Sequence, residues 1–374
     1  MQFRHPIPPV LQAPPQTSDV DFLEALLWMG IVGVSPNMLG WWPAIRWAEL
    51  RYLNAANHET DALRLHPSLV ELDTHHLRAL SDDWGVGIAI QWLTRQFQFA
   101  DVGHGRFYLN DLVEVQKVAE FQRKPGRRGP SKCPDLVAYD SAGLIYLIEC
   151  KGTTTNREHT SIQFAQARQQ KVSVVFADET RVAQRLATGL FISKWNSDEV
   201  STLRISDPPP RFEEPKAGKL CFVKKVPHKT LLAPIKKETI FQGFLAAGLA
   251  EYIADLLPTI PGLEDYGVRQ IAETRPAVQT FGPGREWRGR ISRFALSLPV
   301  RVGDRQYSAC TMREGVSRQL LGRLGSHPTR TKLESVFEES DTSLRTQQRK
   351  VGDFDAYSAE IRHGESFLTE ITLM

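Results

Sequence analysis

The chain has 374 residues, of which 41% are hydrophobic and 24% charged, a composition typical of a globular protein with two or three domains. Its 46 basic and 43 acidic residues leave a net charge of +3, too small to identify a nucleic-acid-binding protein, so any basic surface must be local. Four cysteines without a CxxC pair support neither a zinc ribbon nor a disulfide framework, and we expect a reducing, cytoplasmic environment.

The N-terminal part of the chain indicates neither secretion nor membrane insertion. Residues 1–18 are rich in proline and lack the continuous apolar core of a signal peptide, so we expect an extended arm. The longest strongly apolar run, 26–34, is far shorter than the roughly 20 residues that span a bilayer. Residues 21–34 therefore predict a short buried helix, and we expect no membrane association.

Aromatic and histidine residues follow this helix. Three tryptophans at 38–52 predict a small hydrophobic core, with a platform for nucleobases as the alternative. His75 and His76 lack a matching Cys or His cluster, so we expect a solvated or capping role for them.

A second helix is predicted at residues 84–100, where apolar side chains recur on one side. Ser81, Asp82 and Asp83 come immediately before it and match the composition of a helix start. Both aspartates lie roughly 50° from the centre of the apolar stripe, so spacing does not decide which of them faces inward. Capping and the helix dipole explain both acids equally well.

A strand and a basic loop are predicted next. Residues 112–121 alternate well enough to form the strand that precedes a hairpin. The loop 122–132 then combines five basic residues with two glycines and two prolines. Because this loop leads directly to Asp135, Arg127 and Arg128 are candidates for phosphate contacts, with a solvated charge run as the alternative.

The stretch 134–151, PDLVAYDSAGLIYLIECK, has the pattern of a β-hairpin. Its segments 136–139 and 144–149 are short, apolar and rich in β-branched and aromatic residues, and residues 140–143 between them favour a turn. The second segment is apolar on both faces, as in a central strand that is covered on each side.

Three charged residues are expected together at the open end of this hairpin. If it folds about residue 142, Asp135 faces Glu149, and their carboxylates should lie within about 5 Å of each other. Because side chains alternate along a strand, Lys151 shares the face of Glu149, while Cys150 points to the opposite face.

Two carboxylates beside an ammonium suit phosphodiester hydrolysis. Mg²⁺ prefers oxygen ligands and is typically held by one or two carboxylates plus substrate phosphates. A cationic side chain beside the attacking water can orient it and neutralise charge on a pentacovalent phosphate. The pattern therefore indicates a site for Mg²⁺ or Mn²⁺ with Lys151 next to the nucleophile.

Pro134-Asp135 followed by Glu149-Cys150-Lys151 resembles the signature of the PD-(D/E)xK nuclease superfamily, which includes many restriction and repair endonucleases. The resemblance implies an α/β fold with a restriction-endonuclease-like core, a mixed central sheet flanked by helices in the order helix, three strands, helix, strand. It implies that Asp135 and Glu149 bind the metal and that Lys151 assists the water. A second match, Glu214-Pro215-Lys216, lies in a proline-rich segment that cannot be a central strand.

The resemblance also implies two further site residues. Several members of the superfamily place an additional metal-proximal acid on the first helix, which here makes Asp82 a candidate, with Asp83 as the alternative. Some place a glutamine near the scissile phosphate on the helix after the motif lysine. Residues 162–170 predict that helix, and Gln166 is the candidate, although the aromatic partner that usually follows four residues later is absent. Strands at 171–176, 187–192 and 201–206 would complete the sheet.

The proline-rich segment 207–218 marks the clearest domain boundary. We expect an N-terminal arm and helical region at 1–80, a nuclease-like domain at 81–210 and an α+β domain of unknown role at 219–374. The last of these should contain a helix at 239–257, a hairpin about Gly303-Asp304, a helix at 315–324 and an arginine-rich stretch, 284–293. That stretch could bind nucleic acid or form an exposed basic strand.

The sequence therefore predicts a metal-dependent endonuclease that hydrolyses phosphodiester bonds, with DNA favoured over RNA, in restriction, repair or phage defence. The alternative from another class is a non-catalytic nuclease-fold protein that binds nucleic acid, or that assembles as a homodimer or with a partner protein through its N- and C-terminal regions. A third hypothesis is an interaction protein of different architecture.

Overall fold

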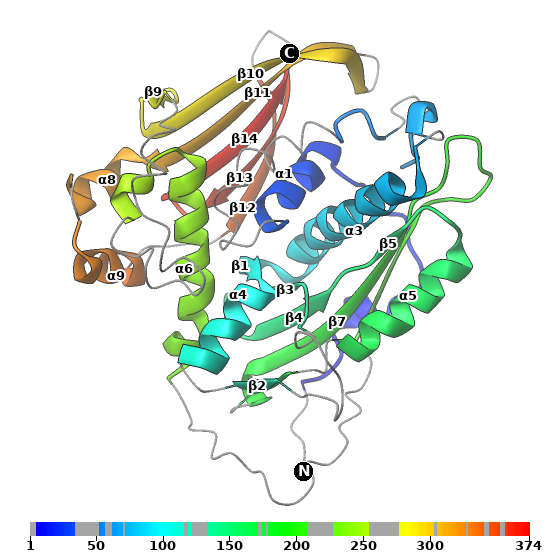
Figure 1. The fold of residues 1–374 in the computed structure, drawn as a ribbon, viewed down its shortest axis with the longest axis horizontal. Coiled ribbons are helices and arrows are strands. Elements are labelled where there is room, and N and C mark those ends of the chain that lie inside the picture. Colours follow the sequence, from blue (N-terminus) through cyan, green and yellow to red (C-terminus); the bar gives the residue numbers. More distant parts are fainter. Residues whose placement is uncertain are drawn as a thin grey trace, which may run out of the picture. The chain divides into compact units, whose positions relative to one another are not determined.

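The computed structural model describes the following residues (Figure 1): 5–33, 52–56, 62–69, 72–115, 119–121, 133–170, 174–176, 179–207, 227–253, 277–302, 305–326, 328–339, 344–351 and 356–374. The chain forms two compact units, one of Met1–Asp21 with Ala55–Ile235 and the other of Phe22–Asn54 with Lys236–Met374. Each unit combines a β-sheet with helices, so the predicted mixed α/β class is confirmed. No helix in the described ranges has the length and apolar character needed to cross a membrane.

The main sheet of the first unit has the order β1-β3-β4-β7-β5, with β8 paired to β7. The pairs β1–β3, β3–β4 and β7–β8 are antiparallel, and β7 runs parallel to β4 and β5, so the sheet is mixed. Its strands are β1 (Phe99–His104), β3 (Leu136–Asp140), β4 (Ile145–Glu149), β5 (Gly152–Thr153), β7 (Val182–Phe191) and β8 (Thr202–Ser206).

Helices and a small ribbon accompany this sheet. The ribbon pairs β2 (Ala119–Phe121) with β6 (Val174–Phe176), so the predicted strand at 171–176 does not extend the main sheet. Both α3 and α5 pack against β5 and β7. The helices of the unit are α3 (Thr74–Phe97), α4 (Gly105–Asn110), the π-helix η4 (Asp111–Val115), α5 (Arg157–Gln170) and the 3₁₀ turns η1 (Pro9–Leu11), η3 (Pro67–Leu69) and η5 (Glu179–Arg181).

The predicted start of the second helix near residue 84 is wrong. Helix α3 begins at Thr74 because the side chain of Asp73 accepts hydrogen bonds from the backbone N–H groups of His75 and His76, at 2.9 and 3.0 Å. An aspartate that satisfies two first-turn N–H groups is a strong N-terminal cap. Asp82 and Asp83 therefore lie within the helix and do not cap it. Both histidines are exposed, as expected.

The strand predicted at 112–121 forms only at the end of that range, as β2, which pairs with β6 and is not the neighbour of the hairpin in the main sheet. That neighbour is β1, whose Gly103 and His104 face Val137 and Leu136 of β3. The region 111–115 is instead a π-helix. Leu112 of this helix is fully buried in the hydrophobic core. A short apolar run does not distinguish these two structures by periodicity alone.

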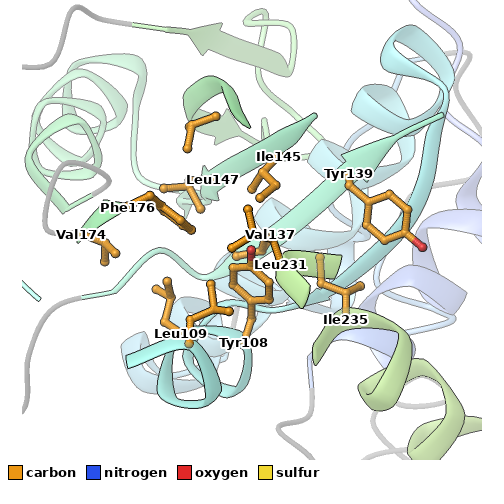
Figure 2. Packing of buried hydrophobic residues seen from close by; sticks show 12 residues of the cluster. Tyr108, Leu109, Val137, Tyr139, Ile145, Leu147, Val174, Phe176, Leu231 and Ile235 are labelled. Atoms are coloured by element: carbon orange, nitrogen blue, oxygen red, sulfur yellow. The ribbon is translucent and has the colours of Figure 1, made fainter. Parts of the chain in front are cut away.

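The hairpin itself has the predicted register, with Leu136 facing Ile148 and Tyr139 facing Ile145. Both of its faces are buried, as expected for a central strand pair. Figure 2 shows one face packed against residues from α4, β6 and the start of α6 (His228–Ala246). The cluster on this face comprises Tyr108, Leu109, Leu112, Val137, Tyr139, Ile145, Leu147, Val174, Phe176, Val182, Leu231 and Ile235.

The second unit is built on an antiparallel sheet of order β12-β13-β14-β11-β10-β9. Helix α1 (Phe22–Val32) packs against β13 and β14 of this sheet, so the predicted 1–80 region is divided between the two units. The strands are β9 (Gln279–Phe281), β10 (Trp287–Val302), β11 (Arg305–Ser317), β12 (Leu344–Val351), β13 (Ala356–His363) and β14 (Phe367–Leu373).

The predicted hairpin of β10 and β11 is confirmed, whereas the helix boundaries differ from the prediction. The predicted helix at 239–257 corresponds to α6, which begins earlier, at His228. The predicted helix at 315–324 begins later, because β11 continues to Ser317 and the Ser317 hydroxyl then caps α8 (Arg318–Leu324). The turn η6 (Ala250–Ile253) and α9 (Arg330–Glu339) complete this unit among the described residues.

Candidate active site

The three residues of the predicted site lie together at the open end of the β3–β4 hairpin. Asp135 immediately precedes β3, Glu149 ends β4, and Lys151 follows two residues later. The Lys151 Nζ donates to Oε1 of Glu149 at 2.6 Å and lies 3.6 Å from Oδ2 of Asp135. Both carboxylates are therefore held beside one ammonium group.

Backbone hydrogen bonds fix this end of the sheet. The carbonyl of Asp135 accepts from the N–H of Gly105, and its Oδ2 accepts from the N–H of Cys150, both at 2.8 Å. Lys151 joins β7 through its own N–H, which donates to the Thr188 carbonyl at 3.1 Å. Cys150 is buried while the lysine is partly exposed, which is the alternation expected for the two residues.

Glu149 has the most demanding environment of the three. Its side chain is 0% exposed, against 23% for Lys151 and 38% for Asp135. Oε1 accepts the lysine, but the buried Oε2 has no hydrogen-bond partner in the described part of the structure. A buried carboxylate oxygen without a partner is costly, and protonation, a cation or another donor relieves that cost.

The electrostatics of the cluster follow from this burial. Burial, with the neighbouring charge of Asp135, raises the pKa of Glu149 to about 8. Burial likewise raises the pKa of Asp135. Burial alone would lower the pKa of Lys151, but the two carboxylates outweigh it and raise that pKa above its ordinary value. Lys151 is therefore an ammonium at neutral pH.

Helix α3 brings a third carboxylate to the site. The negative charge of Asp82 helps to raise the pKa of Asp135, and the backbone N–H of Gly152 favours the ionised form of Asp82. Burial raises the pKa of Asp82 itself, against the opposing effects of Lys151 and Arg78. The structure thus places Asp82 beside the site, whereas Asp83 is the next residue around the helix.

Two glycines allow this close approach of α3. A Cβ atom on Gly85 would lie 2.8 Å from the carbonyl carbon of Lys151, and one on Gly152 would overlap the Ser81 carbonyl. Contacts below 3.0 Å to backbone atoms require the backbone to shift, so only glycine fits at this crossing. The crossing lies within a turn of Asp82.

The remaining candidates have different outcomes. Gln166 lies in α5, but its side chain is outside the described residues. Arg127 and Arg128, like the tryptophans of 38–52, also lie outside them. The sequence did not identify Arg106 of α4. The charge of Arg106 lowers the pKa of the Cys133 thiol, whereas the charges of Asp135 and Glu149 raise it. No motif marks this arginine, because the short helix that carries it was not predicted.

The donor set fits a hard cation. No group of three or more His, Cys, Asp or Glu side chains arranged to hold a metal occurs in the described ranges. Mg²⁺ does not need such a group, since one or two carboxylates with waters and substrate phosphates usually hold it. Asp135 and the unpartnered Oε2 of Glu149 provide two oxygen ligands of the required type.

Comparison with known proteins adds no assignment. The chain matches no family model, and no curated protein or solved structure is significantly similar to it.

Proposed function

We propose that this protein is a metal-dependent endonuclease with a restriction-endonuclease-like core, and that it hydrolyses phosphodiester bonds of DNA. The observation that carries the proposal is the environment of Glu149, a fully buried carboxylate with one oxygen on Lys151 and the other without a described partner. An Asp/Glu/Lys cluster at the end of a buried hairpin has no packing value of its own, because each charge costs desolvation energy.

The order of elements supports the same proposal. Along the chain, α3 precedes the strands β1, β3 and β4, and α5 and β7 follow them. With the two-residue β5 and the elements outside the main sheet left aside, this order matches the succession of helix, three strands, helix and strand that the resemblance implies. Asp135 lies just before β3, Glu149 ends β4 and Lys151 follows it, which are the places that the resemblance implies for the motif residues.

Asp135 and Glu149 would hold Mg²⁺ or Mn²⁺, with Asp82 as a further acid beside them. The cation, when bound, would polarise the scissile phosphate and favour ionisation of a nearby water. Its positive charge would also replace the lysine as partner of the two carboxylates. The Lys151 ammonium would then be free to donate a hydrogen bond to the nucleophile.

Lys151 is better suited to stabilising charge than to accepting a proton. Because its pKa is raised by the two carboxylates, the side chain is protonated at neutral pH and cannot serve as a general base there. Its ammonium can orient a water through one hydrogen bond and neutralise an anionic phosphoryl oxygen through another. The proton released by the water therefore leaves to solvent or to a substrate oxygen.

The test is hydrolysis of duplex DNA by purified protein with Mg²⁺ or Mn²⁺, with and without a chelator. Asp135→Asn keeps the side-chain shape but removes a charge that holds the cation, so we expect most activity to be lost and excess metal to restore part of it. Glu199→Gln is the matched control, because it also removes one carboxylate. Glu199 lies in the loop after β7, is exposed, and has its Oε1 3.9 Å from Nε of Arg157. Wild-type protein that binds metal and DNA yet cuts neither DNA nor RNA would favour the non-catalytic alternative.

A further inference from the structure

A short segment of the second unit carries positive charges only. Residues 315–333, which form the end of β11, α8 and the start of α9, contain three arginines, one lysine and no acidic residue. The acids of α9 begin at residue 334. Because the whole chain has an excess of only three positive charges, the rest of the chain is net negative. This segment is therefore a local basic region that the overall charge does not reveal.

Helix α8 has one face buried against its unit and one face exposed. Its three leucines are buried, whereas its other residues are exposed: Arg318, Gln319, Gly322 and Arg323. At 3.6 residues per turn, these four positions lie within an arc of about 140°. We call them the α8 face. It is a continuous polar surface on one side of the helix, and a binding partner can reach it.

The fold gives no reason for the glycine of the α8 face. Gly325 at the end of the helix has a φ of 77°, which favours glycine, but Gly322 does not have a positive φ. A Cβ atom on Gly322 would meet no other atom within 4 Å. Glycine within a helix is less favourable than alanine, so this residue reduces stability without relieving a clash. What it provides is a helix surface that another backbone can approach closely.

A cationic side chain lies at each end of this open surface. Arg318 is the first residue of α8, and the Nζ of Lys332 in α9 would lie 3.8 Å from a Cβ atom on Gly325, the C-cap residue. Figure 1 shows α8 and α9 next to each other, and the two helices are in contact. The seven residues of α8 extend over about 10 Å. Along one DNA strand a phosphate follows about every 3.4 Å of axis, so this length corresponds to about three phosphate steps.

The charges of Arg318 and Lys332 are not neutralised within the described part of the chain. Both side chains are exposed, and neither has an ion-pair partner there. The carbonyl of Glu286 accepts from the N–H of Arg318 at 2.7 Å, but the Glu286 carboxylate accepts from the N–H of Gly284. Arg323 already interacts with another group. Arg318 and Lys332 are therefore the two cations that an anionic partner can engage directly.

We propose that the α8 face, together with Lys332, binds the phosphate backbone of duplex DNA. The glycine lets the DNA backbone approach the helix, and the two cations contact phosphates on either side of it. Residues 315–333 contain no Phe, Tyr or Trp, so this surface lacks the stacking platform that sequence-independent binding of single strands uses. The choice of DNA rests on the proposed function, because a nuclease needs a surface that holds its substrate beyond the cleavage site.

The first test is the salt dependence of binding, measured with wild-type protein in chelator and a fluorescent duplex. Arg318→Ala with Lys332→Ala should weaken binding to all sequences alike. It should also reduce the slope of log K against log salt by about two, since each phosphate contact contributes about one. Arg318→Lys keeps the charge and should keep the slope, which separates the loss of a phosphate contact from a change in folding.

The second test uses Gly322→Ala, which changes no charge. The added methyl group would hold the DNA backbone away from the helix, so we expect duplex affinity to fall by roughly tenfold, the value of one hydrogen bond to a charged group. The Tm should rise, because alanine favours a helix and its Cβ meets no other atom. A glycine with a purely structural role would not give higher stability together with weaker binding.

The matched control is Arg95→Ala with Lys229→Ala, which removes the same two charges from exposed positions in α3 and α6. Arg95 lies about 20 Å along α3 from Asp82, at 1.5 Å per residue. Lys229 follows His228, whose ring contacts the carbonyl of Gly143 in the hairpin turn. Both positions are therefore far from Lys151, and the slope should stay that of the wild type.

Three results would overturn the inference: no duplex binding by the wild type, an unchanged slope in the Arg318/Lys332 variant, or undiminished affinity in Gly322→Ala. An equal loss of slope in the control would also overturn it, because the effect would then come from overall charge. Normal metal-dependent cleavage with an unchanged slope would reject the α8 face alone. A reduced slope in a protein that never cuts would support the α8 face and reject the nuclease.

Discussion

The ammonium of Lys151 lies 2.6 Å from Oε1 of Glu149, a carboxylate with no exposure to solvent. This contact gives one oxygen of the buried carboxyl group a charged donor, yet leaves the second oxygen without a described partner. A structural ion pair would satisfy both groups. The proposed function explains this arrangement by an additional cation, for which Asp135, whose Oδ2 lies 3.6 Å from the lysine, would be a second ligand.

Lys151→Ala should abolish most hydrolysis while leaving metal binding in place. The change removes the ammonium beside the nucleophile but neither of the carboxylates, so we expect kcat to fall by roughly 100-fold or more. Metal affinity, measured by calorimetry, should be kept or increased, because the competing ammonium is gone. Lys194→Ala, an exposed lysine after β7, is the control. A variant that cuts as well as the wild type would place the chemistry elsewhere.

Asp82→Asn and Asp83→Asn should have unequal effects. The Asp82 charge acts on Asp135 and Lys151, so its loss should weaken metal affinity and reduce hydrolysis at limiting metal. Asp83→Asn changes the neighbouring position on the same helix and should leave both properties near wild type. The measurement is activity as a function of Mn²⁺ concentration for the two variants, and equal curves would remove Asp82 from the site.

The raised pKa of Glu149 predicts a pH dependence of stability in the metal-free protein. A carboxyl whose pKa rises from its ordinary value of 4.5 to about 8 on folding stabilises the fold in its protonated form. This contribution is complete below pH 4.5 and is lost as the pH rises through about 8. In chelator, the Tm of the wild type should therefore fall more steeply between about pH 5 and about pH 8 than that of Glu149→Gln. Parallel curves would contradict the assigned environment.

Gly152→Ala should lower both the stability of the protein and the activity of the site, because it displaces α3. A methyl group at this position would overlap the Ser81 carbonyl and push α3, with Asp82, away from β5. We expect a loss of about 1–3 kcal/mol in unfolding free energy together with reduced hydrolysis. Gly322→Ala is the control for stability, because the α8 glycine has no atoms within 4 Å of an added Cβ and alanine favours a helix. Equal stability of the two variants would contradict the close crossing of α3.

The sequence predicted the hairpin and its charged end because these depend on local rules. A turn at residues 140–143 and the alternation of side chains determine the register, and the register determines which of Asp135, Glu149, Cys150 and Lys151 share a face. The structure has the predicted pairing of β3 with β4 and the predicted burial of Cys150.

Features that depend on distant contacts were predicted incorrectly or left open. The cap at Asp73 is an exception, because it is a local feature that the sequence analysis missed in favour of Ser81, Asp82 and Asp83, which also have the composition of a helix start. The choice of Asp82 over Asp83 required the crossing of α3 over Gly152, which no spacing within the helix reveals. The association of α1 with the C-terminal sheet likewise joins segments far apart in the chain.

The most direct test of the central claim is the location of Mn²⁺ in crystals of the wild-type protein, from its anomalous scattering. The account predicts one site contacted by the carboxylates of Asp135 and Glu149, with the Lys151 ammonium displaced from Oε1 of Glu149. Crystals at saturating Mn²⁺ that show no ion at these carboxylates, with Lys151 still on Glu149, would contradict it.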